Sequence, residues 1–151
     1  MLSLLLSLFY GASLISAKVD PKTIKTVHVV NSNHLDVCFT DYIVNVVNEY
    51  WDSYFPKVAA LKSNFSSSST PFQYLTHGWL LSLYLECPPN VGLDCPSRKE
   101  KENLISSIIA DQTMTFHSFP FNSQNELYDK SLFEYGLYLS TQYLPALISN
   151  Y

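Results

Sequence analysis

The chain is poor in charge and in glycine. Only 15% of its 151 residues are charged, with nine basic side chains against thirteen acidic ones, and it contains four glycines. The net charge of −4 and the absence of lysine or arginine clusters argue against a nucleic acid as a partner. Because 47% of the residues are hydrophobic, the chain can bury a core and is not a disordered segment. Its length suits one compact domain.

The first seventeen residues contain no charged side chain and no histidine. They are rich in leucine and end in Ser16 and Ala17, directly before Lys18. This pattern is typical of a signal peptide cleaved after Ala17, and the apolar run falls short of the ~20 residues that a membrane-spanning helix needs. We therefore expect a signal peptide over residues 1–17, a mature domain over residues 18–151 and no stable membrane span. The expected location is secreted or the secretory pathway, which leaves the extracellular space, the lysosome and the ER or Golgi lumen open.

Two further features fit an oxidising compartment. Cys87 and Cys95 bracket a loop that contains proline and glycine, and we expect them to form a local disulfide. Asn64 begins an Asn-Phe-Ser sequon in a serine-rich stretch, so it is a predicted glycosylation site of a glycoprotein. Cys38 has no evident partner.

Segments typical of strands alternate with segments typical of helices. The β-branched run over residues 24–30 predicts a buried parallel strand, residues 72–76 predict a second strand and residues 113–119 a third. This alternation predicts an α/β fold with a parallel sheet built from βαβα units. Three strands make a narrow sheet, so we expect a partner or a missing domain to cover its edge.

The helices are predicted from apolar spacing and from their start signals. Apolar residues recur at spacings of three and four from Ile43 to Leu61, and Pro56 within this run predicts a kink or a break near Phe55. Two later helices are expected to begin near Ser97 and Ser131, each of which is followed three residues later by a glutamate, as in a capping box.

Candidate ligands follow each predicted strand. In parallel sheets, ligands bind beyond the carboxyl ends of the strands. His34 and Asp36 follow the first predicted strand, His77 follows the second, and His117 lies near the end of the third. The spacing of His34 and Asp36 can place an imidazole and a carboxylate on one side of an extended segment, and zinc accepts that pair. The alternative reading of this short motif is a capped turn.

Longer stretches of the chain resemble a known family. The string VHVVNSNHLDVCFTD, followed by VVNEYWDSYFP, resembles the N-terminal part of the catalytic domain of glycoside hydrolase family 38, the α-mannosidase-like enzymes, and especially a branch with an HLDVGFTD-type motif. The segments FQYLTHGWLLSLYLE and TFHSFPFNSQNELYD resemble the same branch in the expected order. The resemblance spans about residues 26–144. It implies an α/β barrel-like glycosidase domain, retaining hydrolysis of α-mannosides and a zinc ion that grips sugar hydroxyls.

The resemblance carries over only part of the family's active site. His34 and Asp36 match the first two zinc ligands. The nucleophile, the acid/base and the last histidine ligand lie beyond Tyr151, so the catalytic residues are unknown and the Zn site is incomplete. Retaining chemistry needs two carboxyl groups about 5 Å apart, and we therefore expect the chain alone to be inactive.

Two positions depart from the family pattern, and two others are candidates for substrate binding. Cys38 stands where the family has glycine, and Phe39 stands where the better-known branch has tryptophan. His117 and Glu126, in and after the third strand, are placed to contact the carbohydrate substrate of the intact enzyme. The alternative for both is a solvated loop residue.

Three hypotheses follow from the sequence. The first is an N-terminal fragment of a zinc-dependent glycoside hydrolase similar to α-mannosidases. The second is a secreted, non-catalytic α/β binding or interaction module. The third is a hydrolase that uses Cys38 as nucleophile with His34 or His77 as base, although no feature of the sequence requires that arrangement.

Overall fold

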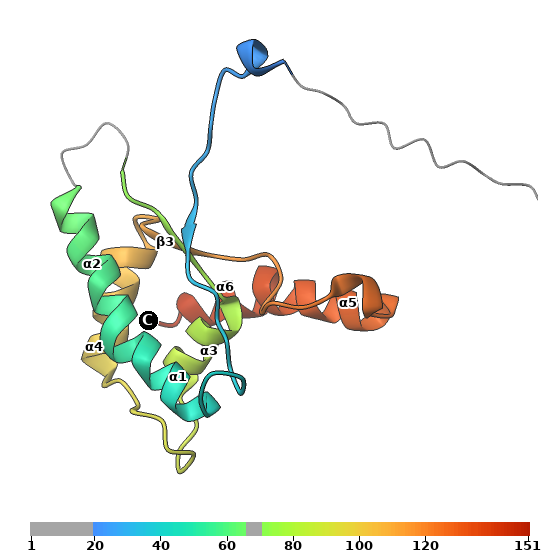
Figure 1. Cartoon of the computed structure of the whole chain (residues 1–151). Helices are drawn as coiled ribbons and strands as arrows, with labels where there is room; N and C mark the ends of the chain where they lie inside the picture. The colour runs from blue at the N-terminus through green and yellow to red at the C-terminus, as the bar shows by residue number, and fades with distance from the viewer. Residues whose placement is uncertain (1–19, 66–70) are drawn as a thin grey trace, which may run out of the picture.

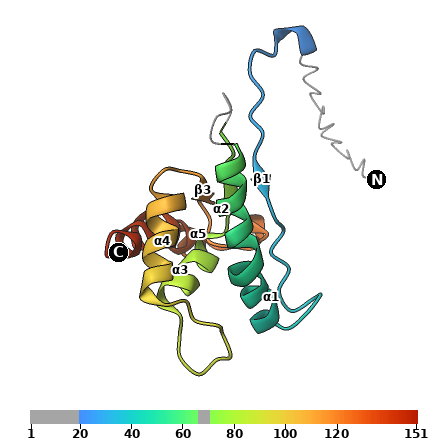
Figure 2. The same cartoon turned by 90° about the vertical axis from the view of Figure 1, so that its left-hand side faces the viewer.

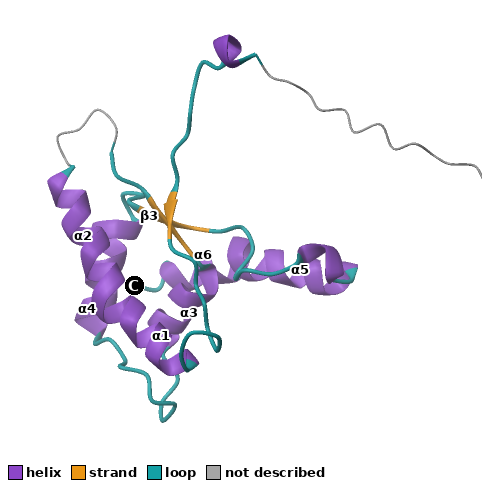
Figure 3. Ribbon diagram, in the orientation of Figure 1, coloured by secondary structure: helices purple, strands orange, loops and turns teal. Residues whose placement is uncertain are grey.

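The computed structural model describes residues 20–65 and 71–151, and the predicted signal peptide over residues 1–17 lies outside this part. The fold mixes helices with a small parallel sheet, which agrees with the predicted α/β class. Figure 3 shows the three short strands near the centre, with helices around them. Within the described part of the chain, no helix is both long enough and apolar enough to cross a membrane.

The sheet consists of β1 (Asn31–Ser32), β2 (Tyr74–Thr76) and β3 (Met114–Phe116), in the order β1-β2-β3. All neighbouring strands are parallel. Tyr74 and Thr76 of the central strand are buried. The second and third predicted strands are therefore present in shorter form.

The first predicted strand is wrong in its position. Residues 24–30 are extended but exposed along their whole length, and pairing begins only at Asn31, opposite Tyr74. The side chains of Val27 and Val29 are each 75% exposed. Residues 71–73 precede β2 as a loop, so residues 24–30 find no neighbouring strand in the described chain. A β-branched composition favours extended backbone, but it cannot supply the partner that a sheet requires.

The longest helical run joins α1 (Ile43–Glu49), a π-helical turn η2 (Tyr50–Tyr54) and α2 (Phe55–Asn64). Of the predicted kink or break near Phe55, the break is absent because the chain stays helical there, and the irregularity takes the form of the π-helical turn that ends at Tyr54. The Phe55 N–H donates to the Tyr50 carbonyl, five residues back, and Pro56 follows in the first turn of α2. A π-turn accommodates such an irregularity because it shifts the hydrogen-bond ladder by one residue.

The remaining elements are one turn before the first strand and the helices of the second and third units. They are η1 (Pro21–Thr23), α3 (Gly78–Glu86), α4 (Arg98–Leu104), η3 (Ile105–Ile109), η4 (Asn125–Leu127), α5 (Lys130–Tyr138), η5 (Leu139–Tyr143) and α6 (Leu144–Ile148).

The predicted capping box of α4 is confirmed. Ser97 Oγ accepts from the Glu100 N–H, and Glu100 Oε2 accepts from the Ser97 N–H at 2.7 Å. The predicted cap of α5 at Ser131 is wrong. Asp129 precedes that helix, and its Oδ1 accepts the Leu132 N–H at 2.8 Å, because an aspartate carboxylate satisfies a free N–H at a helix start.

The core lies between the long helix, α3 and the sheet. Val47 of α1 and Leu80, Leu81 and Leu85 of α3 have no exposed surface. Burying one such side chain stabilises a fold by roughly 1.5–3 kcal/mol. Figure 2 shows α2 running beside β1, and Figure 1 shows α5 projecting to the other side.

Cys87 and Cys95 form a disulfide, with their Cα atoms 5.6 Å apart. Asn48 of α1 holds the enclosed loop: its Nδ2 donates to the Gly92 carbonyl at 3.2 Å, and its Oδ1 accepts the Asp94 N–H at 3.0 Å. Asn64, the predicted glycosylation site, is exposed at the end of α2.

Candidate functional site

Three histidines follow the three strands in register. Ser32, the last residue of β1, pairs with Leu75, and His34 follows two residues later, near enough to His77 to lower its pKa. Thr76 pairs with Phe116, which places His77 beside His117. The His117 N–H donates to the Thr76 carbonyl at 3.1 Å and so continues the ladder. His34, His77 and His117 thus form one line across the carboxyl ends of the sheet, which we name the histidine row.

The inner part of the histidine row is closely packed. The rings of His77 and His117 stack with their centroids 4.9 Å apart and their planes 30° apart. The His77 side chain is 1% exposed, and the Asn33 backbone partly offsets the effect of burial on its pKa. Burial lowers the pKa of His77, and the neighbouring His117 lowers it further. Burial also lowers the pKa of His117. Both imidazoles are therefore neutral at pH 7, the form that binds metals and accepts hydrogen bonds.

The outer part of the row is His34, which is exposed and held from two sides. The Tyr50 hydroxyl donates to the His34 carbonyl at 3.0 Å. Burial is the main cause that raises the Tyr50 pKa, so this hydroxyl stays protonated and remains a donor. Asn122, in the loop after β3, places its Nδ2 3.2 Å from His34 Nδ1. These contacts connect the loops after β1 and β3.

Asp36 lies half-buried in the loop between β1 and α1. The Thr40 hydroxyl donates to its carbonyl at 3.3 Å, and the Cys38 N–H donates to the Asp41 carbonyl at 3.0 Å. Cys38 itself is exposed and has a φ of 67°. This left-handed conformation suits glycine, so the cysteine keeps a turn that a residue without a Cβ adopts more freely.

The donor chemistry of His34 and Asp36 fits zinc, which binds imidazole nitrogen and carboxylate oxygen. Over residues 20–65 and 71–151, no three His, Cys, Asp or Glu side chains are grouped so that they could hold a metal ion. His34 and Asp36 therefore provide at most part of a coordination shell.

The two candidate substrate-binding residues, His117 and Glu126, differ in position and burial. His117 is half-buried within the histidine row. Glu126 lies in η4, exposed, and forms no hydrogen bond or ion pair with the residues that the structure describes. The geometry brings His117, but not Glu126, to the carboxyl ends of the strands.

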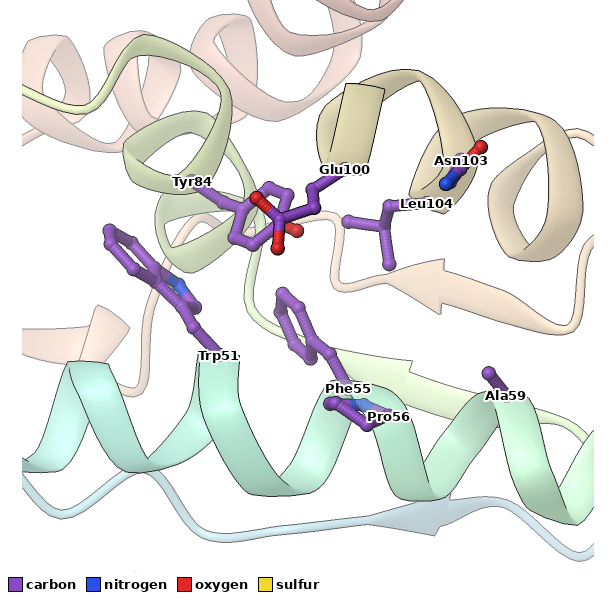
Figure 4. Close-up of a pocket in the computed structure, with 8 residues that line it drawn as sticks. All are labelled: Trp51, Phe55, Pro56, Ala59, Tyr84, Glu100, Asn103 and Leu104. Atoms are coloured by element: carbon purple, nitrogen blue, oxygen red, sulfur yellow. The ribbon is translucent and has the colours of Figure 1, made fainter. Parts of the chain in front are cut away.

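A separate hollow of about 230 Å³ lies on the helical layer, and none of the three histidines lines it. Figure 4 shows its walls, which come from α2, α3, α4 and the π-turn η2: Trp51, Phe55, Pro56, Ala59, Tyr84, Glu100, Asn103 and Leu104. Its carboxylate belongs to Glu100, which is already engaged in the capping box of α4. Trp51 and Tyr84 pack edge to face at 5.4 Å. This hollow is a feature of helix packing and helix capping.

Two residues of the site were not predicted from the sequence. Tyr50 lies on the helix and Asn122 in a distant loop, and both act on His34 across 16 and 88 residues of sequence. The position of Asn122 shortly after a predicted strand was a usable signal, because such loops gather at one edge of a sheet. The contact of Tyr50 depends on the packing of the helix and had no signal in the sequence.

No family model, curated protein or solved structure matches the chain. The resemblance to α-mannosidase-like enzymes thus rests on the quoted sequence segments alone.

Proposed function

We propose that the chain is the N-terminal part of a secreted, zinc-dependent glycoside hydrolase similar to the α-mannosidases, and that it is inactive alone. The observation that carries this proposal is the histidine row, with His34 and Asp36 at one end of it. Ligand sites of parallel α/β domains lie at that edge of the sheet. A mere capped turn would not require two further histidines in register beside it.

His34 and Asp36 would hold the zinc ion, which supplies a charge that binds and polarises sugar hydroxyls. Asn122 is placed to orient the His34 ring. If the Asn122 amide oxygen accepts a hydrogen bond from His34 Nδ1–H, the Nε2 lone pair of the ring is free to bind the metal. If the amide Nδ2–H instead donates to His34 Nδ1, the ring proton lies on Nε2 and blocks coordination there. The present contact, Asn122 Nδ2 to His34 Nδ1 at 3.2 Å, is of the second kind. Turning the amide by 180° converts one into the other.

The exposed run over residues 24–30 supports a larger domain. Its β-branched residues lie on both faces of an extended segment, as in strands that are covered on both sides. In the proposed intact enzyme, further α/β units extend the sheet into a barrel-like domain and bring the missing carboxylates and the last histidine.

Zinc titration by calorimetry tests the proposal on the secreted chain itself. With two protein ligands, the chain should bind zinc weakly, with a dissociation constant above about 10 µM, because catalytic zinc sites use three protein ligands. His34→Ala should abolish that binding, and the exposed His28→Ala should leave it unchanged. Tight stoichiometric binding, or binding that His34→Ala does not affect, contradicts the proposal. An α-mannoside assay on the same sample should show no hydrolysis.

A second candidate is a secreted, non-catalytic binding module. It is favoured by the self-contained core around α3, where Leu80, Leu81 and Leu85 have no exposed surface. Cooperative urea unfolding of the zinc-free chain, together with no zinc binding at millimolar concentration, would favour this module over the glycosidase fragment.

A further inference from the structure

A hollow of about 510 Å³ lies between α2 and the strands β1 and β2. This volume is in the range of small-molecule sites in proteins. Val58 and Leu61 of α2, together with Phe72 before β2, form an apolar wall. Figure 2 shows α2 running beside β1. The three histidines of the histidine row are not among the described residues that line this hollow.

The hollow contains a buried hydroxyl that lacks an acceptor. Tyr74 of the central strand lines the hollow and is 4% exposed, and its hydroxyl has no hydrogen-bond partner among the residues that the structure describes. Burial is the main cause that raises the pKa of Tyr74 to about 12, so the hydroxyl keeps its proton at neutral pH and is a donor. A buried donor without an acceptor costs free energy, which an acceptor supplied by a ligand would recover.

The charge of the hollow is positive. Lys57 of α2 lines it, and the Lys57 ammonium lies 5.3 Å from the centroid of the Tyr54 ring, another part of the wall. The Tyr54 phenol in turn lies near enough to Tyr74 to raise its pKa further, so the ammonium and the Tyr74 hydroxyl belong to one cluster. No aspartate or glutamate is among the described residues that line the hollow. A cation and a donor without a carboxylate beside them favour an anion.

We propose that this hollow binds a small organic carboxylate with an apolar body. The carboxylate accepts hydrogen bonds from Lys57 Nζ and from the Tyr74 hydroxyl, and such bonds to a charged acceptor are stronger than neutral ones. The apolar body lies against Val58, Leu61 and Phe72, where it leaves water. An amine of the same shape would place its charge beside Lys57 with no carboxylate to pair with.

This binding site is independent of the proposed zinc chemistry. None of His34, Asp36 and Asn122 is among the described residues that line the hollow. The further strands proposed for the intact enzyme would join the sheet at its edge, whereas the hollow lies between the sheet and α2. Zinc binding and carboxylate binding can therefore succeed or fail separately.

Titration of the secreted chain with octanoate, followed by NMR, tests the site. Octanoate should bind with a dissociation constant of about 1 mM or lower and should shift the amide signals of residues 54–61 and 72–74. Octylammonium has the same apolar chain with the opposite charge, and it should bind at least tenfold more weakly. An absence of octanoate binding up to about 10 mM overturns the proposal, and so does equal binding of the two probes.

Three substitutions locate the binding. Lys57→Met keeps the length of an exposed side chain without its charge and should weaken octanoate binding at least tenfold. Tyr74→Phe keeps the ring, removes the hydroxyl and should weaken binding at least threefold. Lys99→Met, at an exposed position of α4, is the matched control and should leave binding unchanged.

A further pair of variants tests the charge of the hollow without touching the proposed ligands of the carboxylate. Leu61 is 37% exposed, so polar residues are tolerated there. Leu61→Asp should weaken octanoate binding more than Leu61→Asn, because a second carboxylate then faces the anion. Equal binding by these two variants overturns the proposal, as does unchanged binding by Lys57→Met or an equal loss in Lys99→Met.

Discussion

Gly136 of α5 lies so close to the loop after β3 that a methyl group there should destabilise the fold. A Cβ at this position would lie 2.3 Å from Phe119 Cε2 and 2.4 Å from its Cζ. The ring of Phe119 cannot simply swing aside, because the rings of Phe121, Tyr128 and Phe133 surround it at centroid distances of 5.6–5.7 Å. Gly136→Ala must therefore shift the ring or the helix.

The magnitude follows from two opposing effects. Overpacking of this kind costs about 1–3 kcal/mol, whereas alanine stabilises a helix interior by about 1 kcal/mol relative to glycine. The free energy of unfolding should thus fall by up to about 2 kcal/mol in Gly136→Ala. Urea unfolding followed by tryptophan fluorescence measures this change as a lower midpoint with the same slope.

A paired substitution separates the two effects. Phe119→Leu removes the two ring atoms that the new Cβ would meet, so Gly136→Ala in that background should be neutral or stabilising. If Gly136→Ala alone raises the free energy of unfolding by about 1 kcal/mol, helix propensity is acting without a clash. That result would contradict the close contact between Gly136 of α5 and Phe119 in the loop after β3, the loop that also carries Asn122.

Three further predictions concern single residues near the site. Because burial lowers the His77 pKa in the folded state, the unfolded chain takes up a proton first as the pH falls below about 6.5, and His77 alone should lower the free energy of unfolding by up to about 1.4 kcal/mol per pH unit. The urea midpoints at pH 7.5 and 5.5 should therefore differ less in His77→Gln than in the wild type, and the remaining difference includes that of His117, whose pKa burial also lowers. Asn48→Ala should destabilise the fold by about 1–2 kcal/mol and expose the Cys87–Cys95 loop to proteases, whereas Asn48→Asp should retain the bond to the Asp94 N–H; equal effects of both would contradict the two-sided role of the amide. Cys38→Gly should raise the free energy of unfolding by about 1 kcal/mol because φ is 67°, and Cys38→Ala should leave it unchanged, which thermal unfolding can decide.

The parts of the fold that follow from local sequence were predictable. Ser97 and Glu100 correctly predict the start of α4. The short strand Tyr74–Thr76 lies inside the strand predicted over residues 72–76. The histidines at the strand ends were also predictable, because the order of strands and helices implies a parallel sheet whose carboxyl ends gather at one edge.

The remaining features depend on packing that spacing does not encode. The run Ile24–Val30 reads as a buried strand, yet it lies exposed because no neighbouring strand reaches it. The segment that forms α3 shows little amphipathic period, because its half-buried face also carries the apolar side chains of Trp79 and Leu83. At α5 the sequence pattern predicted Ser131 as the cap, whereas Asp129 occupies that position in the structure and accepts the Leu132 N–H.

The most direct test of the proposed function is to sequence the transcript beyond the codon for Tyr151. The proposal predicts an open frame that continues into a strand carrying an aspartate and, further on, a histidine that completes the zinc site of His34 and Asp36. A stop codon directly after Tyr151 would contradict the glycosidase proposal and leave the chain as a binding module.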